Sequence, residues 1–200
     1  MKRSRLASLF WVLSASVLWA QQPLADDQRW VEQVDVSIAL PSFRTPVAPD
    51  PGPGGDINLG YRFDRTWAIF FGTGYYQYNI PPSSPATSAL LAYIPLVLIL
   101  RTTLGDGPIR PYLFGGAGFA LNTYSQINGP GDPIREVDRA ETDLYLAPGV
   151  GVLYRFSSDM AVFLQTRIDI DFTSQNNLGI PLGNPSVFIP IQAGISFFTL

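Results

Sequence analysis

The stretch MAVFLQTRIDIDF (160–172) decides the fold, because apolar and polar residues alternate along nearly all of it. The even-numbered positions carry the apolar residues Met160, Val162, Leu164, Ile168, Ile170 and Phe172. The odd-numbered positions carry the polar residues Gln165, Arg167, Asp169 and Asp171. We call these two sets the apolar parity and the polar parity. Side chains of a β-strand point alternately to opposite faces, so a period of two indicates a strand with one apolar and one polar face.

Seven further segments resemble strands, and together they predict eight: 31–40, 56–63, 66–78, 89–104, 111–121, 143–156 and 187–199. Segment 89–104 is apolar on both faces, but its twelve-residue apolar core would span only about 18 Å as a helix, and Pro95 interrupts it. We therefore interpret it as a strand. The parity of segment 111–121 is ambiguous.

The connections alternate between short turns and long loops. The short turns are 64–65, 105–110 and 157–159, and the long loops are 41–55, 79–88, 122–142 and 173–186. This layout is typical of an antiparallel up-and-down barrel of the bacterial outer membrane, with the short turns in the periplasm. We predict an all-β fold, an eight-stranded transmembrane β-barrel over residues 21–200, with no further domain.

Residues 1–20 have the features of a cleaved signal peptide. A basic start (Lys2, Arg3 and Arg5) precedes the apolar run 6–18, and Ala20 offers a small residue at the cleavage point. The alternative is an uncleaved anchor helix, for which the run is short. We therefore expect export from the cytoplasm.

The face opposite the apolar parity is small and charged, which favours a polar lumen over a soluble core. Aromatic residues of the apolar parity gather near the strand ends at the short turns: Tyr61, Phe63, Trp67, Tyr154, Phe156 and Phe197. That arrangement matches an interfacial girdle. The alternative is a soluble barrel with an aromatic core.

Composition removes several classes of function. The chain has no cysteine and no histidine, which excludes disulfides, a lipid anchor on cysteine and a Ser–His–Asp hydrolase. A net charge of −3 leaves no basic surface for nucleic acid. We expect no enzyme activity, and we assign no catalytic, cofactor-binding or metal-binding residue. The hypothesis of an aspartate protease that uses Asp143 and Asp171 is supported only by the position of these residues near the rim.

Charged residues on the inward parity predict a luminal polar network: Asp35, Arg62, Arg101, Arg155, Arg167, Asp169 and Asp171. Confined charges must pair, so the favoured interpretation is structural. The alternative is a cation site or an ion gate. Pro95, Pro148 and Pro190 interrupt predicted strands, and we expect an irregular ladder near the extracellular rim there.

Three stretches resemble the small outer-membrane β-barrel family of the OmpA/OmpX type: GYRFDRTWAIFFGTGYY (60–76), LYRFSSDMAVFLQTRIDIDF (153–172) and RPYLFGGAGFA (110–120). The C-terminal QAGISFFTL (192–200) resembles the strand recognised for insertion, although Leu200 replaces the usual aromatic. The resemblance implies an integral outer-membrane protein of a Gram-negative bacterium, related to the porin-type barrels, in contact with membrane lipid and monomeric.

The loops are the expected working surface. Loop 122–142 is the longest and carries most of the loop charges, which suits an extracellular ligand or surface partner, or merely a solvated cover. We expect a non-enzymatic protein with a structural or surface-interaction role. The alternatives are a narrow channel for small solutes and a secreted lipocalin-like binding protein.

Overall fold

The computed structural model describes residues 29–41, 50–80, 87–128, 137–172 and 186–199, so the predicted signal peptide lies outside it. Its strands are β1 (Trp30–Pro41), β2 (Gly52–Arg62), β3 (Trp67–Ile80), β4 (Thr87–Thr103), β5 (Ile109–Asn128), β6 (Val137–Arg155), β7 (Met160–Arg167), β8 (Asp169–Phe172) and β9 (Ser186–Thr199). No helix among the described residues is long and apolar enough to cross a membrane.

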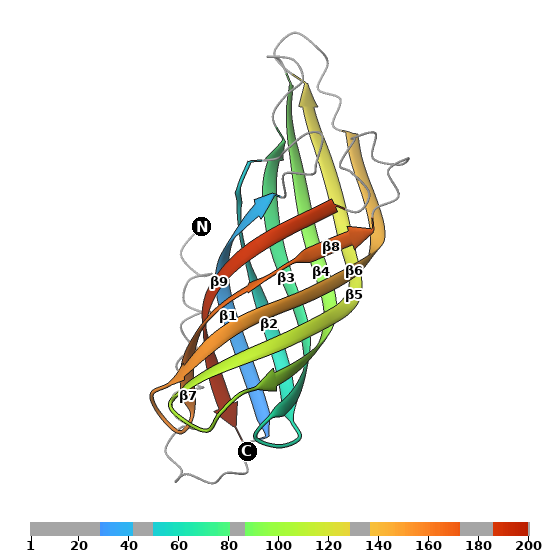
Figure 1. Ribbon diagram of the computed structural model, residues 1–200. Coiled ribbons are helices and arrows are strands. Elements are labelled where there is room, and N and C mark those ends of the chain that lie inside the picture. Colours follow the sequence, from blue (N-terminus) through green and yellow to red (C-terminus); the bar gives the residue numbers. More distant parts are fainter. Residues whose placement is uncertain (1–28, 42–49, 81–86, 129–136, 173–185, 200) are drawn as a thin grey trace, which may run out of the picture.

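The strands close into a single antiparallel barrel (Figure 1). Each strand pairs with the next along the chain, and β1 pairs with β9 to close the sheet. β7 and β8 are two parts of one strand, because both lie between β6 and β9. The barrel therefore has eight strand positions, as the sequence predicts.

The register of the barrel is staggered. A path of Cα partners that starts at Trp30 returns to β1 at Leu40, ten residues further along. The path runs through Tyr61, Ile69, Leu100, Gly115, Pro148, Ile168 and Ile189. Two of its steps cross the break in β7–β8: the first follows the hydrogen bond from the Ile168 N–H to the Pro148 carbonyl, and the second follows the register that β7 and β8 share against β9. A stagger of ten over eight strands gives a tilt of about 40° to the barrel axis, in the usual range for barrels of this size.

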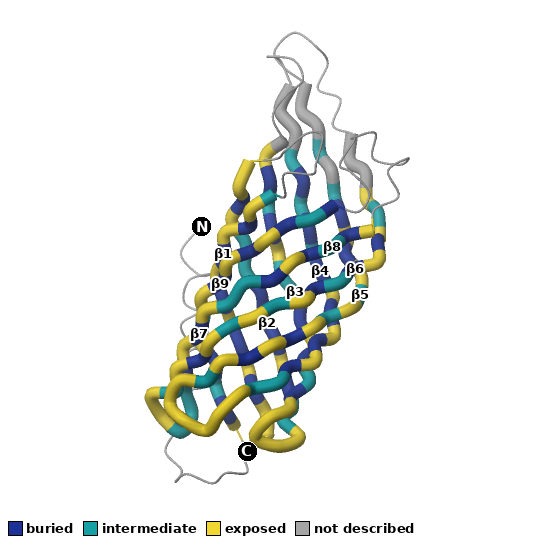
Figure 2. Tube along the Cα trace, viewed as in Figure 1, coloured by how far each residue is buried: buried dark blue, intermediate teal, exposed yellow. Residues whose placement is uncertain are grey.

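Exposure alternates along every strand (Figure 2). Inward side chains are buried, and outward side chains are exposed and mostly large and apolar. The register also decides the parity of segment 111–121, since Tyr112 and Phe114 face the lumen whereas Leu113 and Phe119 face outward. The outside of the barrel is therefore a belt of exposed apolar side chains, the arrangement of a barrel surrounded by lipid.

The lumen is more aromatic than the sequence analysis expects. Glycines on the inward face make room for rings on the neighbouring strand: an added Cβ at Gly60 would lie 2.2 Å from Phe70, and one at Gly151 would lie 2.4 Å from Tyr112. The small inward residues are thus partners of large ones. The interior is filled by rings as well as by charges.

Aromatic residues of β1 and β2 gather at the end of the barrel that carries the short turns. Trp30 and Tyr61 lie edge to face with centroids 5.3 Å apart, and Tyr61 contacts Phe63 in the same way at 5.7 Å. The Arg29 guanidinium donates a hydrogen bond to the Tyr61 hydroxyl at 3.1 Å. Amphipathic rings of this kind suit the boundary between hydrocarbon and water.

The main-chain ladder is interrupted beside each of the three strand prolines. Pro148 and Pro190 flank the break at Ile168 that separates β7 from β8, and two successive pairs are missing on each side. Pro95 coincides with a similar gap between β3 and β4. The missing N–H of proline explains these gaps. The hypothesis of an irregular ladder is confirmed, although the break at Ile168 lies beside Arg167 and not at the rim.

Two loop boundaries differ from the sequence analysis. β5 and β6 stay paired as far as Gln126 and Val137, so most of the predicted loop 122–142 is strand. Similarly, the pairing of β1 with β2 begins at Gly52, inside the predicted loop 41–55. Most of these residues are polar or small, so alternation of hydrophobicity could not reveal them.

The short turns are held by local hydrogen bonds. In the turn between β2 and β3, the Asp64 carboxylate accepts backbone N–H groups of Thr66 and Trp67, both at 2.7 Å. These two donors lower the pKa of the exposed Asp64 carboxyl. In the turn between β4 and β5, Gly105 has a φ of +78°, a conformation that disfavours residues with a Cβ.

We expect Gly105→Ala to lower the free energy of unfolding by about 1–2 kcal/mol, because alanine is strained at this φ. An added Cβ would meet no atom within 4 Å, so packing contributes nothing to the effect. Gly107→Ala in the same turn is the control, since Gly107 lacks a positive φ. Urea unfolding in lipid vesicles measures both, and equal stability of the two variants would refute the argument.

Candidate functional site in the barrel lumen

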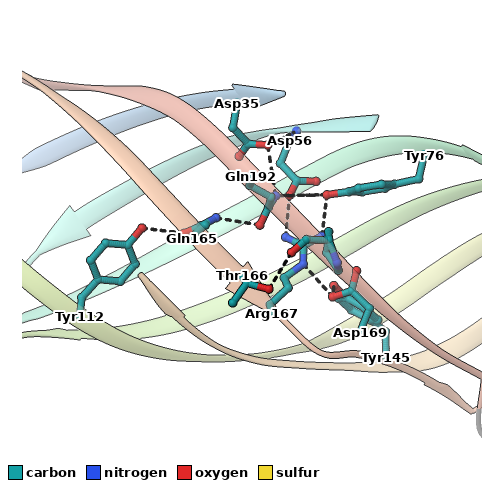
Figure 3. A network of polar contacts seen from close by, with 11 residues as sticks. Asp35, Asp56, Tyr76, Tyr112, Tyr145, Gln165, Thr166, Arg167, Asp169 and Gln192 are labelled. Carbon is teal, nitrogen blue, oxygen red and sulfur yellow. Dashed lines mark hydrogen bonds and ion pairs between the residues drawn. The ribbon is translucent and has the colours of Figure 1, made fainter. Parts of the chain in front are cut away.

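Arg167 is the centre of a buried polar network (Figure 3). Its side chain is 2% exposed and enters the lumen from the last residue of β7. The guanidinium forms ion pairs with Asp56 at 2.6 Å and with Asp169 at 2.7 Å. Its third nitrogen donates to the Tyr76 hydroxyl at 2.9 Å. One cation thus connects β2, β3, β7 and β8 across the lumen.

Gln192 extends the network toward β1. Its amide nitrogen donates to Asp56 and, at 3.1 Å, to Asp35. Its amide oxygen accepts a hydrogen bond from Gln165 at 2.9 Å, and Gln165 in turn accepts one from Tyr112 at 2.8 Å. Side chains from β1, β2, β3, β5, β7, β8 and β9 are therefore connected through the lumen.

A layer of rings lies beside this network. Tyr93 packs edge to face against Tyr76 and Tyr145, with centroids 5.9 and 5.8 Å apart. Tyr78 stacks on Phe188 at 4.6 Å. Tyr145 also donates to the Asp169 carboxylate at 2.7 Å. All five rings are buried, so this layer fills part of the lumen.

A second polar cluster lies further toward the long connections. The Asn122 amide donates to Asp143 at 2.8 Å and to Asp171 at 2.7 Å. Asp171 therefore lies apart from the Arg167 network to which the sequence analysis assigned it. Both carboxylates are almost fully buried, which lends no support to a protease that must reach a peptide. No group of three or more metal-ligating side chains occurs in the described part of the chain.

Three of the predicted network residues lie at the other end of the lumen. Arg101 stacks on Phe70 and Tyr112, with its guanidinium carbon 4.3 and 5.1 Å from the ring centroids. Arg62 and Arg155 lie over the Phe198 ring at 5.9 and 4.7 Å. The structure thus brings together Asp35, Arg167 and Asp169 but not the other four predicted residues.

Several members of the network are not among the predicted residues, namely Asp56, Tyr76, Tyr112, Tyr145, Gln165 and Gln192. All have the inward parity, so alternation could have placed them in the lumen. Only the register between distant strands shows that they meet Arg167.

The chain matches no protein-family model and no curated protein. Among solved structures, it is similar to Neisserial surface protein A, with a TM-score of 0.60, 18% identity and coverage of 88% of this chain and 99% of the other. A major outer membrane protein of Thermus thermophilus has a TM-score of 0.58, 10% identity and coverages of 84% and 99%.

A third similar structure is Ail, the attachment invasion locus protein of Yersinia pestis, in complex with the heparin analogue sucrose octasulfate. Its TM-score is 0.56 at 9% identity, with 85% of this chain and 97% of Ail covered. The fold is that of the small integral outer-membrane β-barrels. In this fold the short turns are periplasmic. The lipocalin-like alternative required the apolar parity to face inward, but it faces outward.

Proposed function

We propose that the protein is a non-enzymatic outer-membrane barrel with a closed lumen that acts at the cell surface. The observation that carries this proposal is that β5 and β6 are longer than a strand needs to be to cross the membrane. A membrane-spanning strand needs about 9–11 residues. β5 has 20 residues and β6 has 19, so this hairpin continues well beyond the apolar belt.

The outward side chains change character along the hairpin. Phe119 and Leu144 belong to the apolar belt, whereas the outward positions above them include Thr123 and Thr142. Polar residues there indicate water outside the membrane. The β4–β6 wall rises above the other strands in Figure 1. A raised, solvated hairpin offers a surface to a partner outside the cell.

The filled lumen supports this role over the alternative of a narrow channel. Eight strands leave an interior only wide enough for side chains, and the Arg167 network and the tyrosine layer occupy it. The complex with the heparin analogue sucrose octasulfate is a property of Ail. Segment 122–142 contains four acidic and two basic residues, which favours a basic partner surface over a sulfated polyanion.

The test is a shortened hairpin. Residues 124–139 are replaced by Asn-Gly, which suits a two-residue hairpin turn between Thr123 and Ala140 and preserves Asn122 and Asp143. Bacteria that express the full-length chain should adhere to surfaces coated with basic proteins more than bacteria without it, and the shortened variant should lose this gain. A heat-dependent gel shift verifies that the variant is folded. Equal adhesion of both forms, or steady conductance of the reconstituted barrel, would contradict the proposal.

A further inference from the structure

The periplasmic end of the lumen contains four arginines that all have the inward parity. Arg62 and Arg155 are the last residues of β2 and β6, and Arg110 is the second residue of β5. Arg101 lies deeper, on β4. Electrostatic repulsion acts between Arg110 and both Arg62 and Arg155, and also between Arg62 and Arg101. Arg62 and Arg155 also share a neighbour, because both guanidinium groups lie over the Phe198 ring, at 5.9 and 4.7 Å from its centroid. The four guanidinium groups therefore form one cluster of positive charge.

The acidic neighbours of the cluster lie in the short turns. Among the described groups, the turn carboxylates of Asp64 and Asp159 interact favourably with it, through Arg62 and Arg155 respectively. The acidic residues of the lumen bond to Arg167, Gln192 or Asn122, closer to the extracellular end. Positive charge is thus in excess at the periplasmic end.

Arg101 is the member with an incomplete environment. It is 5% exposed, and no carboxylate pairs with it within the described ranges. Its Nε has no hydrogen-bond partner among the described atoms. Two aromatic faces hold the guanidinium in place, but they do not supply a hydrogen-bond acceptor for the Nε–H. A buried cation of this kind is costly unless an anion accompanies it.

We propose that this arginine cluster, formed by Arg62, Arg101, Arg110 and Arg155, binds a phosphate-bearing anion from the periplasmic side. The three rim arginines are only half-buried, so they are accessible from the periplasm. Guanidinium groups bind phosphate through paired N–H donors in a fixed planar geometry. A phosphate would supply the acceptors that Arg101 lacks and would relieve the repulsion among the four cations. The site lies at the opposite end from the proposed surface hairpin, so the two proposals are independent.

The experiment uses the full barrel in phosphatidylcholine vesicles and compares inorganic phosphate with chloride at equal ionic strength. We expect phosphate to raise the urea midpoint of the wild type and to shift the NMR signal of the Arg101 Nε–H. Arg101→Met should abolish the phosphate-dependent rise. Arg65→Gln, which removes an exposed arginine from a turn outside the cluster, should retain it. An equal rise in all three proteins would be a general salt effect and would overturn the proposal.

A second arm identifies the source of the phosphate. The same proteins are compared in phosphatidylglycerol vesicles without free phosphate. A rise that depends on Arg101 in this arm alone assigns the site to a lipid headgroup, and one with inorganic phosphate alone assigns it to a free anion. The absence of an Arg101-dependent effect in both arms would refute the site. Without added anion, Arg101→Met should be at least as stable as the wild type, which also shows that the variant folds.

Discussion

Replacing Arg167 by methionine should lower the free energy of unfolding by about 3–5 kcal/mol. The change leaves the carboxylates of Asp56 and Asp169 in the lumen without their cation, and the Tyr76 hydroxyl without one of its donors. Urea unfolding in phosphatidylcholine vesicles, followed by tryptophan fluorescence, measures the loss. It should be the largest effect of any single substitution considered for this barrel.

The control for this prediction removes the charges on both sides. Arg167→Met combined with Asp56→Asn and Asp169→Asn should recover most of the lost stability, because the two carboxylates that pair directly with Arg167 are then neutral. If the single variant loses less than about 1 kcal/mol, which is the range of exposed pairs, water must replace the guanidinium. The network would then contribute little to stability.

Gly118→Ala should cost about 1–3 kcal/mol through overpacking. A Cβ at Gly118 would lie 2.0 Å from the Leu96 carbonyl oxygen and 2.9 Å from the Val97 Cα, so backbone atoms of β4 would have to move. Gly115, on the same strand, is the matched control. An added Cβ at Gly115 meets nothing within 4 Å, and the position faces outward.

The comparison of the two glycine variants isolates packing from chain entropy. Both substitutions restrict the unfolded chain equally, so their difference reports the contact across the strand pair alone. We expect Gly115→Ala to change the stability by no more than about 0.5 kcal/mol. Coinciding unfolding curves of the two variants would contradict the prediction, because they would show that the β4 backbone at Leu96 and Val97 moves aside at little cost.

The sequence predicts the strands well because alternation is a strong signal wherever a strand separates lipid from lumen. Segment 160–172 has the right parity throughout, and the ambiguous segment 111–121 lacks a signal because glycine and alanine occupy both its faces. Strand ends were less predictable. Above the belt both faces of β5 and β6 are polar, with Asn122 and Asp143 inward and Thr123 and Thr142 outward, so the sequence shows no alternation of hydrophobicity there.

The sequence predicts which residues face the lumen, but it does not predict which of them contact one another. Parity alone places Asp35, Arg101 and Arg167 inside. Arg167 and Asp56 are 111 residues apart, and they meet only because of the stagger of the barrel, which no local pattern encodes. The aromatic residues in the lumen could also have been predicted, since an inward glycine such as Gly60 indicates a large ring on the adjacent strand.

The break at Ile168 makes the wall of the barrel mechanically uneven. β8 has only three Cα partners on each side, so it is the part of the wall with the least main-chain support. Side chains compensate there: the Thr166 hydroxyl donates to the Pro190 carbonyl at 3.0 Å, and Arg167 crosses the lumen to β2. The ion pairs in the lumen therefore stabilise the part of the wall around Ile168, where the main-chain pairing is interrupted.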